Sequence, residues 1–440
     1  MQKQLRNRFG RLSARLQATA LYALTFALAI STNGESVLVG PPVIPAEPKS
    51  FGSGGDTANG DTNQVDRAGG PVSGAAGGSF QNRNPFQWGP LILHPRIGYG
   101  LSYGTGLQSQ PGQARKSVIN TVSAGFGLDV GRHWDLGYTA GATFYSNPKF
   151  KNNVDHNVTV HGHTTYEDWS FNLAQSVAIS SDPLVETAQQ TDQQSYSTSL
   201  GIGYQINGDL SASLTLGQEL NYSSGITNGV GSSSDWTLSG GLNYQLGPGL
   251  STGLGAGFGY NKVAQGTDNT YEDVSLNLSW AFARKLSLSL NGGAQIRQYL
   301  GSGQPSLLSP TFGVTLNYHP FVFTTLYLSA SRSIGASFFQ NQVTENTSVN
   351  LGLSQRLFTK YYLSLNGGYG LSAYQDSAPG GTAGITGRSD TRTFFSVSLN
   401  RSFLKRGTAA LSYSKSQNSS NSNGYGYNSD QAGLSLSYSY

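Results

Sequence analysis

The sequence has no cysteine and a single methionine, and only 11% of its 440 residues are charged. The absence of cysteine excludes disulfides, thiolate metal sites, a cysteine nucleophile and a lipid-modified N-terminal cysteine. Charge is sparse compared with the roughly 25% that is typical of soluble domains. No apolar run approaches the roughly 20 residues that a membrane-spanning helix needs. These absences exclude a disulfide-stapled domain and a helical membrane protein.

Glycine (58 residues) and tyrosine (24) are abundant, and from Leu91 onward apolar and polar residues alternate. The stretches LHPRIGYGLSYG from Leu93, LSASLTLGQELNY from Leu210 and LSLSLNGGAQI from Leu286 show this period of two. Successive side chains of a strand point to opposite sides, so the pattern predicts strands with one apolar and one polar face. Helical periodicity is absent, and the chain is expected to be all-β.

The N-terminus has the pattern of a secretory signal peptide, which we place at residues 1–33. An apolar run, LYALTFALAI, follows a basic region. Removing the five cations of that region from the 27 Lys and Arg leaves 22, against 23 Asp and Glu, so the remaining chain is close to neutral. Nothing in this balance favours nucleic-acid binding. The five cations are Lys3, Arg6, Arg8, Arg11 and Arg15.

Residues 34–87 are rich in Gly, Ser and Pro and predict a flexible segment on the periplasmic side. Residues 88–440 then hold about eighteen strands, or sixteen if the weakest, 156–166, is dropped with a neighbour. Short connections alternate with long polar ones, as between the predicted strands 169–180 and 195–206. Each strand is long enough to cross a bilayer, which takes about 9–11 residues. A β-propeller with a repeat of about 40 residues fits less well, because each repeat holds two long strands rather than four short ones.

This pattern predicts a transmembrane antiparallel up-and-down β-barrel with short periplasmic turns and long extracellular loops. In hydrocarbon every backbone group must be paired within the protein, so the last strand must close on the first. The final decapeptide, QAGLSLSYSY, keeps its period to the end of the sequence. Outward aromatic residues that precede the short turns are expected to form an interfacial girdle. They are Tyr204, Tyr244, Trp280 and Tyr318.

The decapeptide resembles the C-terminal insertion signal of Gram-negative outer-membrane β-barrels. The matching residues are Gln431, Gly433, Leu436, Tyr438 and the terminal aromatic Tyr440. The general pattern is also similar to porin-like barrels associated with exopolysaccharide gene clusters. The resemblance implies location in the bacterial outer membrane, contact with outer-membrane lipid and insertion by the barrel-assembly machinery.

Six charged residues have the parity of the lumen and form no ring of one sign. We therefore expect a polar channel that passes small hydrophilic solutes without strong ion selectivity. Two alternatives remain open: a barrel for polysaccharide export or uptake, and a structural or adhesive barrel with a blocked lumen. Inward aromatics for stacking sugars are few, namely Tyr145, Tyr327 and Phe394. The six lumen charges are Arg96, Asp129, Asp135, Glu219, Arg297 and Arg392.

The sequence shows no pattern typical of an enzyme or of a cofactor site. None of the six histidines has a recognisable serine and carboxylate partner. His161 and His163 share one face of a strand, where lumen lining explains them as well as a metal site would, and we predict no metal. Glycines from Gly253 to Gly259 recur every second residue with no helix after them, which excludes a dinucleotide-binding loop. Their inward parity predicts either a bent wall or a close approach by a loop or by the N-terminal segment.

Overall fold

A computed structural model describes residues 86–224, 232–264, 266–283, 285–339, 341–358, 360–377, 387–404 and 406–440. All of these belong to one compact unit. The predicted signal peptide and nearly all of the predicted flexible segment lie outside the described residues. Within the described ranges, no helix is long and apolar enough to cross a membrane.

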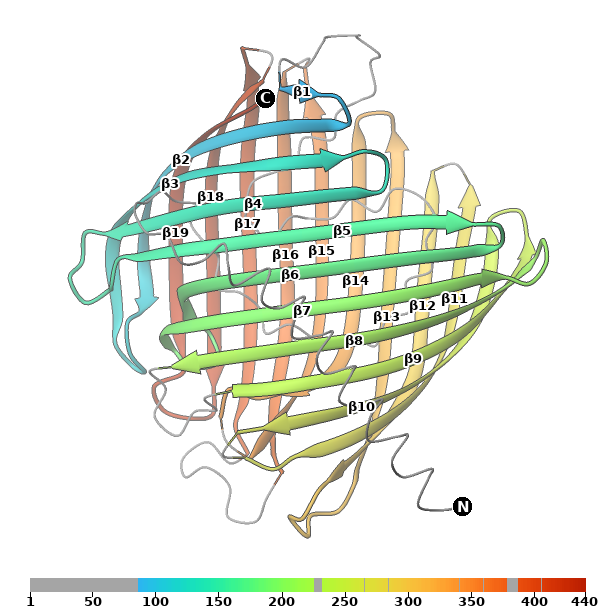
Figure 1. Cartoon of the computed structure of the whole chain (residues 1–440). Coiled ribbons are helices and arrows are strands. Elements are labelled where there is room, and N and C mark those ends of the chain that lie inside the picture. The colour runs from blue at the N-terminus through green and yellow to red at the C-terminus, as the bar shows by residue number, and fades with distance from the viewer. Residues whose placement is uncertain are drawn as a thin grey trace. The chain divides into compact units, whose positions relative to one another are not determined.

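The described chain is a succession of antiparallel strands (Figure 1). The strands are β1 (Gln87–Trp88), β2 (Leu91–Gln108), β3 (Ala114–Val130), β4 (Trp134–Tyr145), β5 (Asn153–Tyr166), β6 (Trp169–Leu184), β7 (Gln189–Gln205), β8 (Leu210–Ser224), β9 (Ser232–Gly247), β10 (Leu250–Val263), β11 (Asn269–Ala283), β12 (Leu286–Tyr299), β13 (Leu307–Phe321), β14 (Thr324–Ala336), β15 (Gln342–Leu357), β16 (Tyr361–Asp376), β17 (Ser389–Phe403), β18 (Gly407–Ser420) and β19 (Tyr427–Ser439).

The sheet closes on itself. From β2 to β19 each strand pairs with the next in sequence, and β19 pairs with β2 from Asp430↔Thr105 to Ser439↔Arg96. The two-residue β1 pairs only with the start of β2. The predicted up-and-down barrel of about eighteen strands is therefore confirmed, and every strand edge of the wall has a partner, as a sheet in hydrocarbon requires.

The two faces of the wall differ as the alternation predicts. Large apolar side chains such as Leu254, Leu276 and Leu351 are more than half exposed on the outer face. Leu242, Leu254 and Leu276 are paired in one row across β9, β10 and β11, so the outer face is apolar across several strands. The other face carries Ser, Thr, Asn and charged residues. An apolar band outside and a polar lumen inside are the construction of an outer-membrane β-barrel, and this chain has that construction.

The strands reach further toward the long-loop end than the sequence predicts. The predicted loop between 180 and 195 is instead a continued hairpin, in which β6 and β7 pair up to Leu184↔Gln189 and leave a turn only at 185–188. The polar stretch KSQNSSNSNGYGYNSD from Lys415, whose composition predicts another long loop, belongs largely to β18 and β19. Polar residues such as Asp182 and Thr191 remain in strand conformation there because cross-strand pairing satisfies their backbone groups.

Candidate functional site

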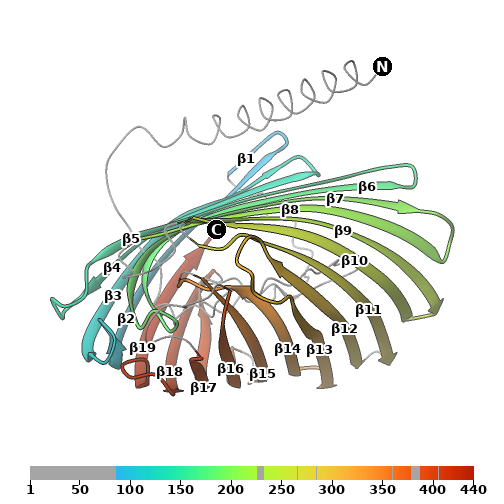
Figure 2. The ribbon, with the colours of Figure 1, turned by 90° about the horizontal axis from the view of Figure 1, so that it is seen from below.

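The β6–β7 hairpin bends out of the wall into the space that the barrel encloses. Figure 2 shows its green end curving away from the neighbouring strands. Its turn, residues 185–188, is termed the tip below. The tip meets residues that lie 151 to 202 positions later in the sequence, beside the long-loop ends of β14 and β17. Contacts over such separations, between strands that are not neighbours in the sheet, place the tip inside the lumen.

Glu186 carries most of this contact. One carboxylate oxygen, Oε1, accepts hydrogen bonds from the Ser337 hydroxyl at 2.6 Å and from the Phe338 backbone N–H at 2.8 Å. The side chain is almost fully buried, and its second oxygen, Oε2, has no hydrogen-bond partner. Burial raises the pKa of the Glu186 carboxyl above its ordinary value, and the two hydrogen bonds offset part of that shift.

Arg388 holds the backbone of the same tip. Its Nη1 donates a hydrogen bond to the Glu186 carbonyl at 2.7 Å, and its Nε donates one to Asp390 at 2.9 Å. The guanidinium packs on two aromatic rings, 3.7 Å from the centroid of Tyr425 and 4.5 Å from that of Tyr374. A fully buried arginine with a carboxylate partner and two ring faces is held in a single position. The tip is therefore docked on a rigid receptor.

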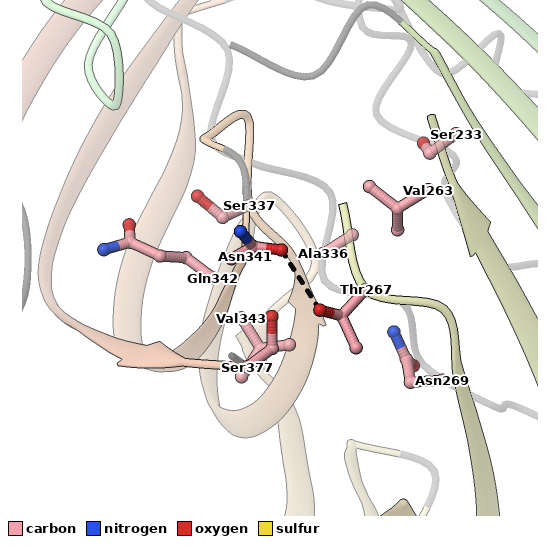
Figure 3. Close-up of a pocket in the computed structure, with 10 residues that line it drawn as sticks. All are labelled: Ser233, Val263, Thr267, Asn269, Ala336, Ser337, Asn341, Gln342, Val343 and Ser377. Carbon is pink, nitrogen blue, oxygen red and sulfur yellow. Dashed lines mark hydrogen bonds between the residues drawn. The ribbon is translucent and has the colours of Figure 1, made fainter. Parts of the chain in front are cut away.

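A second set of connections joins the long-loop end of the barrel beside the tip. The Thr267 hydroxyl, between β10 and β11, donates a hydrogen bond to Asn341 Oδ1 at 3.1 Å, between β14 and β15 (Figure 3). Ser337 and Ser377 line the same junction, which encloses a cavity of about 10 Å³, room for roughly one water molecule. The loops at this end thus hold one another and the tip.

A buried polar network covers the lumen face of β9 to β12. The Tyr271 hydroxyl donates to Asp235 at 2.7 Å, and Asn261 donates to the other oxygen of the same carboxylate at 2.9 Å. Arg297 stacks on the Tyr271 ring at 4.6 Å and donates to Asn269 at 3.0 Å. The Tyr271 ring fits because Gly259 lies beneath it: a Cβ at Gly259 would overlap the ring.

The described residues show which side chains lie against the glycine run from Gly253 to Gly259, for which the sequence predicts a bent wall or a close approach by a loop or by the N-terminal segment. Side chains of the adjoining strands β9 and β11 fill the space above these glycines, Asp273 over Gly257 and Tyr271 over Gly259 among them. The tip hydrogen-bonds to Ser337, Phe338 and Arg388, and nearly all of the N-terminal segment lies outside the described residues. Glycine here makes room for large neighbouring side chains that lie flat along the sheet.

The six predicted lumen charges differ in their exposure and in their partners. Arg96 and Asp135 are exposed, and Asp129 accepts a hydrogen bond from His94 Nε2 at 3.1 Å. Glu219 lies opposite Asp235 in the register, and Arg392 lies 5.8 Å from the Phe394 ring. Arg297 differs from the expectation of a solvated lining residue, because only 2% of it is exposed and it belongs to the buried network.

The predicted girdle residues Tyr204, Tyr244, Trp280 and Tyr318 are all exposed, as is Tyr438. The four girdle residues lie near the ends of β7, β9, β11 and β13, just before the short connections to the next strands, and Tyr438 lies near the end of β19. The remaining residues of the decapeptide lie along β19: Gln431, Gly433 and Leu436 pair with Gly104, Ser102 and Tyr99 of β2. The described residues contain no group of three or more His, Asp or Glu side chains arranged to hold a metal ion.

Sequence reasoning missed Glu186 and Arg388. Both lie in segments whose polar composition predicts a loop, and neither belongs to an alternating strand pattern. Glu186 is the only acidic residue between Asp182 and Asp192, in the short apolar–polar stretch PLVETA, and that stretch is the one sequence feature that sets the tip apart from a solvated loop.

No family model matches the sequence, and no curated protein matches it. Among solved structures, a BenF-like porin from Pseudomonas fluorescens is 11% identical, with 79% of this chain and 99% of that chain covered and a TM-score of 0.46. OccAB4 from Acinetobacter baumannii is 12% identical, with 82% and 100% covered and a TM-score of 0.43. The outer membrane protein OpdK from Pseudomonas aeruginosa is 11% identical, with 79% and 98% covered and a TM-score of 0.43.

Proposed function

We propose that this barrel is a porin-like outer-membrane channel, rather than an enzyme, and that it passes small hydrophilic solutes by diffusion. The observation that carries the proposal is a wide barrel with a polar lumen that is narrowed by one inserted hairpin. Barrels of 16–18 strands enclose an aqueous passage, and a loop or hairpin inside such a barrel sets the size of what can pass.

Lumen charge supports passage of polar solutes of either sign. The wall from β5 to β11 carries acidic residues on the lumen parity, among them Asp155, Asp182 and Asp235. The wall from β12 to β17 carries Arg297 and Arg392, and Arg388 lies directly before the start of β17. Charges of both signs in one lumen favour solutes that carry dipoles or hydroxyl groups. They do not give the channel a strong selectivity for cations or for anions.

The docked tip also favours an alternative, a barrel whose lumen is closed and whose outer loops carry the function. Glu186 is almost fully buried where it meets Ser337 and Arg388, so little water separates the tip from the wall. The two proposals make opposite statements about ion flow through the barrel.

Single-channel recording from purified protein in a planar bilayer tests the proposal. We expect steps of stable conductance from the correctly folded, heat-modifiable protein. The reversal potential in a salt gradient should show weak ion selectivity. Absence of any current from correctly folded barrels would overturn the channel proposal and favour the blocked barrel. The matched control is the same protein with the tip undocked, Glu186→Ala combined with Arg388→Ala, which distinguishes a lumen blocked by the tip from one blocked elsewhere.

A further inference from the structure

The wall from β14 to β17 carries a neutral, aromatic surface that faces the lumen. Two inward rings lie over the two central strands, one over each. Tyr327 comes from β14 and lies across Gly352 of β15, where a Cβ would overlap its ring. Phe394 comes from β17 and lies across Gly368 of β16 in the same way. Each ring is thus laid flat against the wall by a glycine on the neighbouring strand.

The register places the two rings in adjoining rows. Tyr327 shares a row with Gly352 and Asn366, and Phe394 shares the next row with Gly368 and Asn350. Rows of one face are two residues apart, about 7 Å along a strand. The rings therefore lie in adjoining rows and come from opposite sides, Tyr327 lying over β15 and Phe394 over β16.

Carboxamides and hydroxyls surround the two rings. The Tyr327 hydroxyl donates a hydrogen bond to Asn366 Oδ1 at 2.9 Å, which leaves the Asn366 amide N–H groups available for other acceptors. Asn350 lies 3.5 Å from Ser329, and Ser331 lies 3.1 Å from Ser348 in the row above. We call the set Tyr327, Ser329, Asn350, Asn366 and Phe394 the neutral panel. All five are half-buried, so part of each side chain is accessible from the lumen.

We propose that the neutral panel binds the pyranose rings of a saccharide that passes through the barrel. The axial C–H groups of a sugar ring carry partial positive charge and pack on the negative face of an aromatic ring. The hydroxyl groups at its edge are both donors and acceptors, and side-chain amides match them in both roles. The panel supplies faces and edges of this kind in adjoining rows, and it has no charge of its own.

The position of the tip supports this assignment. It docks at Ser337, directly after β14, and at Arg388, directly before β17. These are the long-loop ends of the two strands that carry Tyr327 and Phe394. The two rings of the panel therefore lie on the same two strands that the docking residues adjoin, further from the long-loop end. Arg392, which lies 5.8 Å from the Phe394 ring on the side of the tip, would also accommodate a carboxylated sugar.

This proposal deepens the proposed channel function and rests on it, so the test uses two independent readouts. Binding of maltohexaose to the detergent-purified barrel is measured by isothermal titration calorimetry, which requires no ion flow. Interruption of the single-channel current by the same sugar is then recorded in a planar bilayer. Polyethylene glycol of similar mass is the control solute, because it lacks hydroxylated rings.

We expect maltohexaose, and not polyethylene glycol, to bind and to interrupt the current. Tyr327→Leu and Phe394→Leu each remove a ring face and should weaken binding by roughly tenfold or more, which corresponds to about 1.4 kcal/mol. Tyr327→Phe keeps the ring and should retain most of the affinity. Tyr369→Leu, on the lipid side of β16, is the matched control and should leave the affinity unchanged. Heat-modifiable migration verifies that each variant is folded.

Failure of maltohexaose to bind the folded wild-type barrel overturns the panel, whatever the conductance. Equal affinity in Tyr327→Leu, Phe394→Leu and Tyr369→Leu overturns it as well. Absence of current with intact, ring-dependent binding overturns the channel and leaves the panel in place. Binding of an aromatic carboxylate in place of the sugar would assign the panel to a different solute and so reject the saccharide.

Discussion

The ring of Tyr440 meets the ring of Phe86 edge to face, with 4.9 Å between their centroids and 82° between their planes. The backbone N–H of Tyr440 donates to the Pro95 carbonyl at 2.9 Å, and the Arg406 guanidinium lies 3.4 Å from the ring centroid. The last residue of the sequence is thus held by the segment before β1, by β2 and by the turn before β18. These contacts lie at the seam where β19 closes on β2.

The first prediction concerns this seam. Deletion of Tyr438 to Tyr440 removes the pairing of Tyr438 with Ile97 and of Ser439 with Arg96, together with the ring contacts of Tyr440. We expect the shortened protein to fail to insert, because an unpaired strand edge is unfavourable in hydrocarbon. The measurement is the fraction of protein that is membrane-embedded and heat-modifiable. Tyr440→Phe, which keeps the ring, is the control; normal assembly of the deletion would show that the seam closes without these residues.

The second prediction concerns the two faces of β11. Leu276 is 60% exposed on the apolar face, whereas its neighbour Ser275 has the opposite parity at the same depth. An arginine at Leu276 should reduce the free energy of unfolding by about 2–4 kcal/mol, because its charge would lie in hydrocarbon. Ser275→Arg should be tolerated, because the side chain points into the lumen. Urea unfolding in lipid vesicles measures both changes, and the reverse order of the two would invert the assignment of the faces.

Leu288, an outward residue of β12 that alternation alone would also offer, is a poorer site for this experiment because it is only the third residue of its strand. The register places it opposite Trp280, at the predicted girdle, where the cost of a charge falls toward zero.

The third prediction concerns pH and the tip. Burial raises the pKa of the docked Glu186 carboxyl above the ordinary 4.5, so docking favours the protonated acid. The docked state is therefore most stable below pH 4.5 and loses stability as the pH rises through the raised pKa. The charged groups around Glu186 are Arg388 and Asp390, which pair with each other, and the tyrosines Tyr374 and Tyr425 face the same site.

We expect the fraction of time spent in the highest-conductance state to increase from pH 4 to pH 8. Glu186→Gln imitates the protonated acid and should flatten this dependence. Asp192→Asn, an exposed acid on the same hairpin, is the control and should keep the dependence of the wild type. A wild-type profile that is flat, or that falls with rising pH, would contradict docking through Glu186.

The fourth prediction concerns two glycines, one on β10 and one on β12. A Cβ at Gly259 would overlap the Tyr271 ring, whereas a Cβ at Gly292 meets nothing within 4 Å. Gly259→Val should force the ring away from Asp235 and destabilise the barrel by about 1–3 kcal/mol, as overpacking does. Gly292→Val should be close to neutral. The urea midpoint of the folded barrel measures both, and equal midpoints would show that Tyr271 moves aside at no cost.

Alternation along the chain was sufficient to predict the closed antiparallel barrel, its strand number and its two faces. A strand reverses the side of its side chains at every residue, so the faces of Leu276 and Ser275 follow from their positions alone. Closure follows as well, because hydrocarbon leaves no partner for an open sheet edge. The aromatics that precede the short turns are exposed, and the final decapeptide pairs with β2; their roles as a girdle and as an assembly signal stay predictions.

Only the tertiary structure decided which side chains meet inside the lumen. Glu186 and Arg388 are 202 residues apart, and no periodicity relates them. Their contact depends on the β6–β7 hairpin bending inward and on the curvature of the closed wall. The same holds for Tyr327 and Phe394: their inward parity is in the sequence, but the glycines that lay them flat are on the neighbouring strands, at positions fixed by cross-strand register. Local pattern sets the face of each residue, and the closed sheet sets its neighbours.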